Sequence, residues 1–80
     1  MQDVEEKILD MLEELTGDEI VKENKDIDLL EEDLIDSLDY VELLVMIQDE
    51  FGLVIAPSDV TKEEMATPAR IIETVKKRLA

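Results

Sequence analysis

The chain has 80 residues, of which 23 are acidic and 8 are basic, so its net charge at neutral pH is −15. This length allows one small domain, and a hydrophobic content of 45% is enough for one apolar core. The negative charge argues against binding to nucleic acid or to an anionic lipid surface, and the absence of cysteine and histidine excludes disulfides, thiolate or imidazole metal sites and histidine-dependent catalysis.

The first expected element is a helix over residues 3–15, where apolar residues recur at helical spacing: Val4, Ile8, Met11, Leu12 and Leu15. Gly17 predicts the end of this helix. From Asp18 to Asp36 the periodicity stops, and scattered aliphatic residues predict a long first loop that is held across the helical core. The pattern leaves room for a short turn or helix inside this loop.

A second long helix is expected from Ser37 to Phe51, where helical spacing is strong, and Gly52 predicts its end. Its apolar stripe consists of Val41, Leu44, Ile47 and Phe51, with Leu43 beside it. The roughly opposite stripe is of mixed character and consists of Leu38, Glu42, Val45 and Asp49.

The last part of the chain is expected to form a loop, a short turn and a final helix. The run Leu53-Val54-Ile55 has no strand to pair with, so we expect a buried loop. A short helical turn is expected from Pro57, with Ser58 as its cap. Thr67-Pro68 predicts the start of the last helix, because Thr caps helices and Pro is favoured at the first helical position. The elements together predict an all-α fold over residues 1–80: a single-domain, small four-helix bundle with three longer helices, one short helix and a long first loop.

Acidic residues are concentrated in the middle of the chain. No lysine or arginine occurs from Asp26 to Thr61, whereas eleven acidic residues do: Asp26, Asp28, Glu31, Glu32, Asp33, Asp36, Asp39, Glu42, Asp49, Glu50 and Asp59. Like charges packed without counter-charges destabilise a fold by repulsion. We therefore interpret the acidic second long helix as an interaction surface for basic proteins rather than as a solvated face alone.

The sequence offers no catalytic or metal site of its own. Asp26-x-Asp28 begins like a calcium-binding loop, but Leu30 occupies the third ligand position and Ser37 the position of the final bidentate glutamate. With only two glycines, a glycine-rich phosphate loop is excluded. The carboxylates are plentiful, but a bundle of this size offers no deep cleft to shift their pKa values. We therefore expect a protein that is not an enzyme.

Ser37 remains as the candidate for covalent chemistry. It lies where the long loop meets the second long helix, and the residues alone favour a role as the N-cap of that helix. Asp36 can equally cap, with Asp39 three residues later, which would free the Ser37 hydroxyl. No general base lies nearby in the sequence, so a covalent role would make Ser37 an acceptor for a group added by another enzyme. A phosphodiester there would be favoured by the N–H groups and dipole of the helix.

Three segments together resemble the acyl carrier protein family: Asp36-Ser37-Leu38, Val41-Glu42-Leu43 and Glu50-Phe51-Gly52. The triplet alone is a weak signal, but the likeness covers nearly the whole chain in length, register and acidity. It implies a four-helix bundle whose Ser37 receives 4′-phosphopantetheine from coenzyme A through a separate, magnesium-dependent phosphopantetheinyl transferase. The terminal thiol of this arm would carry an acyl or aminoacyl group as a thioester between partner enzymes.

The resemblance also implies where partners bind. Asp36 matches the aspartate of the family that is implicated in binding the metal of the transferase. The residues expected to bind the transferase and the acyl- or aminoacyl-loading enzyme are Asp36, Leu38, Asp39, Glu42, Val45 and Asp49. The acids would steer basic docking patches, and the two aliphatic side chains would give a small apolar anchor.

Two groups of residues point to different cargoes within the family. The stretch from Asp18 to Asp36 and the spacing from Phe51 to Thr67-Pro68 resemble the carriers that deliver D-alanine. Those carriers typically have Gly-Thr after the D-S-x triplet and a tryptophan near position 65, where this chain has Asp39-Tyr40 and Met65. Asp39 is closer to the fatty-acid pattern. The cargo therefore stays open between an acyl group, of fatty-acid or polyketide type, and D-alanine or another aminoacyl group.

The composition fits a different class of function equally well, namely an unmodified acidic helical adaptor domain that binds basic protein partners. For both classes we expect a cytoplasmic monomer without direct membrane insertion. No apolar run approaches the ~18 residues of a membrane span, and residues 1–6 show no basic segment followed by an apolar one, as a signal peptide would.

Overall fold

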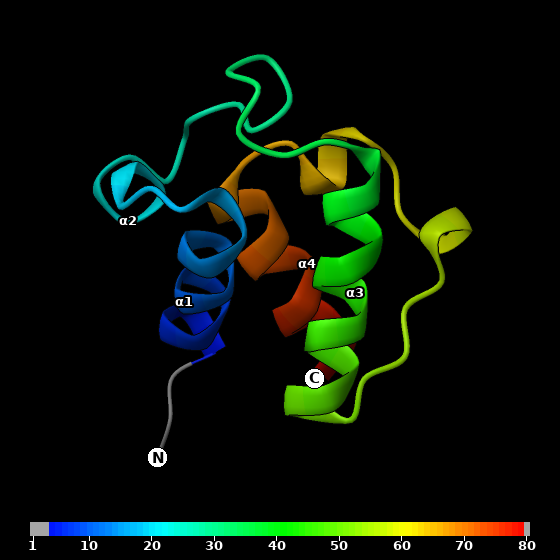
Figure 1. Cartoon of the computed structure of the whole chain (residues 1–80). Coiled ribbons are helices and arrows are strands. Elements are labelled where there is room, and N and C mark those ends of the chain that lie inside the picture. Colours follow the sequence, from blue (N-terminus) through cyan, green and yellow to red (C-terminus); the bar gives the residue numbers. More distant parts are fainter. Residues whose placement is uncertain (1–3, 80) are drawn as a thin grey trace.

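The computed structural model describes residues 4–79, in which helices are joined by loops and no strand occurs. The long helices are α1 (Val4–Thr16), α3 (Ser37–Phe51) and α4 (Pro68–Leu79). The connections hold the short α-helix α2 (Ile20–Glu23) and two single turns of 3-10 helix, η1 (Pro57–Asp59) and η2 (Glu63–Met65) (Figure 1). The prediction of an all-α fold with three long helices and one short helix is confirmed. Within this described part of the chain, no helix has the length and apolarity needed to cross a bilayer.

The ends of the long helices obey the capping rules from which they were predicted. Gly17 and Gly52 follow α1 and α3 with φ angles of 69° and 67°, the left-handed conformation that glycine adopts without steric cost. At the start of α4, the Thr67 hydroxyl accepts the N–H of Arg70 at 3.2 Å, and Pro68 is the first helical residue. Residue 3, which the sequence analysis included in the first helix, lies outside the described residues.

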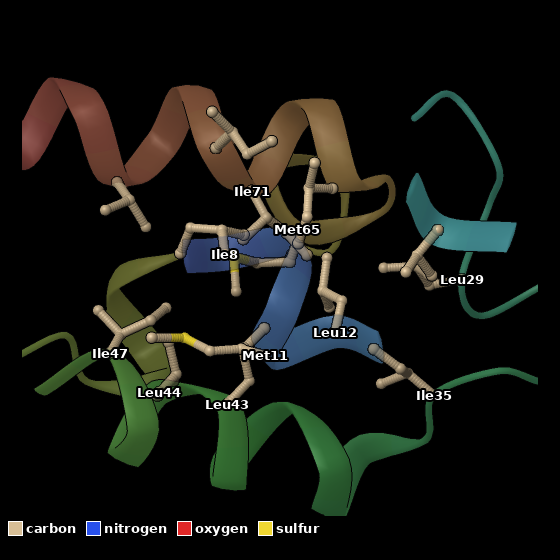
Figure 2. Packing of buried hydrophobic residues seen from close by; sticks show 14 of the residues in the cluster. Ile8, Met11, Leu12, Leu29, Ile35, Leu43, Leu44, Ile47, Met65 and Ile71 are labelled. Atoms are coloured by element: carbon tan, nitrogen blue, oxygen red, sulfur yellow. The ribbon is translucent and has the colours of Figure 1, made fainter. Parts of the chain in front are cut away.

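The core lies where the three long helices meet, and α1 packs against α2, α3 and α4. Figure 2 shows apolar side chains from α1, α3 and α4 converging, joined by Leu29 and Ile35 from the long first loop. The largest side chains that are fully buried are Ile8, Leu12, Leu29, Leu43, Ile47 and Ile71. Each contributes about 1.5–3 kcal/mol of hydrophobic stabilisation relative to an exposed side chain.

The long first loop crosses one end of the bundle and is bonded to the chain beneath it. The N–H of Leu29 donates to the carbonyl of Ala66 at 2.8 Å, and the N–H of Ala69 donates to the carbonyl of Lys25 at 2.9 Å. Val21 in α2 and Leu29 are fully buried. The predicted loop held across the core is therefore confirmed, and its short helix is α2. Because Lys25 and Leu29 are both bonded to residues 66–69, the loop delivers the chain to the start of α3 in a defined position.

Three details of the second half of the chain were predicted wrongly. Val41 is 47% exposed, because α3 is oriented with Leu43, Leu44 and Ile47 toward the core. Val54 is 70% exposed, since the extended segment after Gly52 buries Ile55 and turns the preceding side chain outward. Ser58 is not a cap: η1 begins at Pro57, which leaves Ser58 inside the turn, and the N–H of the preceding Ala56 donates to the Asp59 carboxylate at 3.3 Å.

Candidate functional site

The start of α3 is capped by Asp36. Its carboxylate accepts the N–H of Asp39 at 2.9 Å, and the Asp39 carboxylate accepts the N–H of Asp36 at 3.2 Å. This reciprocal pair is a capping box, in which each acid satisfies a backbone donor that the helix leaves free. Of the two capping arrangements that the sequence allowed, the structure therefore has the one that uses Asp36.

Ser37 is consequently released from capping. It is the first residue of α3 and is exposed, and within the described chain its hydroxyl has no hydrogen-bond partner. The N–H groups of the first helical turn surround this position with positive partial charge. The hydroxyl thus stands on a rigid junction, open to another molecule, where an attached negative group is electrostatically favoured.

Tyr40 fixes the first turn of α3 to the neighbouring turn η2. Its hydroxyl donates a hydrogen bond of 2.6 Å to the carbonyl of Met65, and its ring is half-buried. Burial, with a smaller contribution from the negative charge of Asp28, raises the pKa of Tyr40 from 10.0 to about 12. In Figure 1 the start of α3 and the η2 turn lie together at the end of the bundle that the long first loop crosses.

Replacing Tyr40 with phenylalanine tests this contact. We expect the free energy of unfolding at neutral pH to fall by about 1 kcal/mol, the usual contribution of one hydrogen bond. Because the pKa of Tyr40 is raised in the folded state, its hydrogen bond contributes fully to the stability of the wild type below pH 10. That contribution is lost as the pH rises toward 12. The difference between wild type and Tyr40→Phe in urea denaturation should shrink over this range. The chain has one tyrosine, so its absorbance titration reports Tyr40 directly, and titration near 10.0 would contradict the buried contact.

Four of the predicted docking residues, Leu38, Glu42, Val45 and Asp49, form one exposed stripe on α3, the docking stripe. Leu38 is 79% exposed and Val45 is 52% exposed, and Glu42 and Asp49 lie on the same stripe without an ion pair or hydrogen bond in the described chain. At the start of the helix, Asp36 is exposed, whereas Asp39 is partly buried. The structure therefore brings all six predicted residues onto α3 and its N-cap, and two of the six, Asp36 and Asp39, also bond to each other as the cap.

One acid of α3 has a counter-charge that the sequence analysis did not anticipate. Lys7 of α1 forms an ion pair with Glu50, and its ammonium lies 5.9 Å from the centre of the Phe51 ring. This pair relieves repulsion at the C-terminal end of α3. The acids of the docking stripe, Glu42 in the middle of α3 and Asp49 in its last turn, keep their negative charge without a partner in the described chain.

A pocket of about 290 Å³ opens beside Ser37. It lies between the start of α3 and the segment from η1 to η2, and its lining residues are Leu30, Ser37, Tyr40, Val41, Pro57, Val60, Thr61, Lys62 and Met65. The position of Val41 and Lys62 beside Ser37 was not predicted from the sequence. Val41 follows Ser37 by four residues, a spacing that places two side chains on the same helix face. For Lys62 the sequence holds no such signal, because only the tertiary fold brings it to this pocket.

The Asp28 carboxylate, considered above as part of a calcium-binding loop, is used by a local turn. It accepts the N–H groups of Leu30 at 3.1 Å and of Glu31 at 3.0 Å. Among residues 4–79, acidic side chains do not gather in any group of three or more that could hold a metal ion.

Comparison with known proteins identifies the family. A family model described as a phosphopantetheine attachment site matches residues 6–75, which is most of the chain. The chain belongs to this family of phosphopantetheine carriers. Three similar relatives are named D-alanyl carrier proteins. The relative from Abiotrophia defectiva is 51% identical over 77 residues, covering 96% of this chain and 98% of the relative. Those from Enterococcus faecalis (strain ATCC 700802 / V583) and Bacillus cereus (strain B4264) are 43% and 41% identical, each over at least 90% of both chains.

Membership in the family establishes the kind of function. The carrier holds 4′-phosphopantetheine covalently on a serine, and it serves as an acyl or aminoacyl carrier. Carriers of this family work with a phosphopantetheinyl transferase and with loading enzymes. The resemblance stated from the sequence is thereby confirmed at the level of the family and its prosthetic group.

Proposed function

We propose that Ser37 is the serine that carries 4′-phosphopantetheine and that residues 1–80 form a single carrier domain. The observation that supports this most strongly is the free, exposed hydroxyl of Ser37 at the start of α3, available because Asp36 takes over the cap. The other serine, Ser58, lies inside the η1 turn, away from the start of a long helix. The N-terminal end of α3 suits a phosphodiester, since its N–H groups and dipole favour negative charge.

We infer that the cargo is D-alanine, held as a thioester on the thiol of the arm. The supporting fact is that the similar relatives are named D-alanyl carrier proteins. The chain departs from the usual pattern of those carriers at positions 39, 40 and 65. Asp39 is used locally, in the capping box with Asp36. Positions 40 and 65 adjoin each other: Tyr40 bonds to the carbonyl of Met65, and both line the same pocket. The aromatic ring that those carriers typically supply from near position 65 is supplied here from position 40. The departures thus have local reasons, in the capping and the packing of α3, and do not themselves call for another cargo.

The partners fit the acidic stripe of α3. We propose that the transferase and the D-alanine-loading enzyme dock through basic patches onto Asp36, Leu38, Asp39, Glu42, Val45 and Asp49. We also propose that these partners supply all the chemistry, while this chain carries the cargo as a cytoplasmic monomer. Opposite charges speed the encounter, and the exposed Leu38 and Val45 add apolar contact at its centre.

The cargo is tested on the phosphopantetheinylated protein, prepared with coenzyme A, Mg²⁺ and a broad-specificity transferase. We expect a D-alanine-activating ligase with ATP to add one D-alanyl group, seen by intact mass and removed by hydroxylamine as a thioester would be. L-Alanine with the same ligase, and acyl groups offered by an acyl-carrier synthetase, serve as controls. Efficient acylation without D-alanylation would refute the cargo. A chain that accepts no arm would instead favour the unmodified adaptor.

A further inference from the structure

The pocket beside Ser37 combines features that suit the part of the prosthetic group nearest the attachment point. Most of its lining is apolar, with Leu30, Val41, Val60 and Met65 among the residues that form it. Its volume of about 290 Å³ is just below the roughly 300–1,000 Å³ of small-molecule sites, so it can shelter a part of the arm but not the whole. On the serine, phosphopantetheine begins with a phosphodiester, and one methylene group further along stands a carbon that bears two methyl groups, which is a compact apolar unit.

Lys62 is the one basic side chain among the residues that line this pocket. It forms no ion pair with any described residue, whereas Lys7, Lys22, Lys25 and Lys77 all pair with carboxylates. Lys76 is also without an ion pair in the described chain, but it lies outside the pocket, so Lys62 is set apart by its position beside Ser37. It is also the first basic residue after Lys25 in the sequence, so the fold brings it to Ser37 across the acidic middle of the chain.

A phosphodiester on Ser37 would be stabilised by a positive charge on the side that faces the pocket. The neighbouring Asp36 and Asp39 are both carboxylates, and although each accepts a backbone N–H, their charges repel a third negative group. The N–H groups of the first turn offset part of this repulsion. Lys62 is the side chain placed to offset more of it from across the pocket.

We propose that Lys62 and the pocket form a cradle for the arm: the Lys62 ammonium pairs with the phosphodiester on Ser37, and the dimethyl carbon of the arm lies against Val41 and Val60. The inference rests on the proposed attachment at Ser37. The cradle gives the arm a docked state along the side of α3, in exchange with an extended state in which the thiol reaches a partner enzyme. An exposed ion pair is weak, so the docked state exchanges readily with the extended one.

The experiment uses isotope-labelled protein carrying an unlabelled arm, with complete loading checked by intact mass. Filtered nuclear Overhauser spectra then detect contacts between the methyl protons of the arm and those of Val41 and Val60. We expect such cross-peaks in the wild type, and their intensity should fall about two- to fivefold in Lys62→Gln, in line with the loss of one exposed ion pair. Lys62→Arg should retain them. The matched control is Lys76→Gln, because Lys76 is exposed on α4, lies outside the pocket and forms no ion pair in the described chain.

Each outcome decides the inference. Cross-peaks that weaken in Lys62→Gln but not in Lys76→Gln support the cradle. Three results would overturn the cradle but not the attachment at Ser37. The first is the absence of cross-peaks from the loaded wild type. The others are cross-peaks that persist in Lys62→Gln, and cross-peaks that weaken equally in Lys76→Gln. A wild-type protein whose arm is found on another residue, or that accepts none, would overturn both the cradle and the proposed attachment.

Discussion

Ser37→Ala is expected to abolish phosphopantetheinylation completely. The hydroxyl oxygen is the atom that would bond to phosphorus, and alanine offers no substitute for it. The fold should be preserved, because Ser37 is exposed, its hydroxyl makes no hydrogen bond in the described chain, and the capping box uses Asp36 and Asp39. Alanine is also a strong helix former, so the free energy of unfolding should change by no more than about 0.5 kcal/mol. Intact mass after incubation with coenzyme A, Mg²⁺ and transferase measures the first expectation, and urea denaturation measures the second.

Two further variants separate the chemistry at Ser37 from general effects on docking and folding. Ser58→Ala removes the other serine and should load as the wild type does. Asp36→Asn keeps an N-cap, since asparagine caps as well as aspartate, but removes one negative charge beside the hydroxyl. It should load more slowly while unfolding at nearly the same urea concentration. A Ser37→Ala protein that still gains the arm would show that the attachment lies elsewhere.

The helices of this protein could be predicted because the residues that begin and end them act locally. Gly17, Gly52 and Thr67-Pro68 mark helix boundaries whatever the rest of the chain does, and α3 runs from Ser37 to Phe51 as its spacing predicts. The burial of individual side chains was less predictable. Val41 belongs to an apolar stripe in the sequence, but the orientation of α3 is decided by the packing of several elements together, which leaves Val41 beside the pocket.

Part of the candidate site could likewise be predicted from the sequence, and part of it could not. Asp36, Ser37, Leu38 and the stripe that follows are close in sequence, so their common face could be predicted from helical periodicity. The sequence allowed either Asp36 or Ser37 to be the N-cap of α3 and could not decide between them, because serine and aspartate are both good caps. The opposite wall of the pocket comes from residues 57–65, and its position depends on long-range contacts such as the bond from Tyr40 to Met65. Lys62 reaches the site only through those contacts, which no local pattern encodes.

Reversing two charges on the docking stripe is expected to slow partner recognition strongly. In Glu42→Lys/Asp49→Lys, both changed residues are exposed and lack partners in the described chain, and they lie two helical turns apart on one face. Electrostatic steering raises association rates by about 10- to 1,000-fold. We therefore expect kcat/KM for arm transfer and for cargo loading to fall at least about tenfold at low salt. The variant should remain folded, since a lysine near the C-terminal end of α3 favours the helix dipole.

The control must change the net charge equally without touching α3. Glu6→Lys/Glu23→Lys does so, because both residues are exposed on α1 and α2, and each pair of substitutions takes the net charge from −15 to −11. If docking uses the stripe, this control loses little activity. The difference in kcat/KM between the wild type and the α3 variant should also shrink as salt is raised, because salt screens the attraction of the wild type and the repulsion of the variant alike. Equal losses in the two variants would mean that partners sense only the total charge of the carrier. In that case Leu38 and Val45 would no longer be expected to mark the centre of the interface.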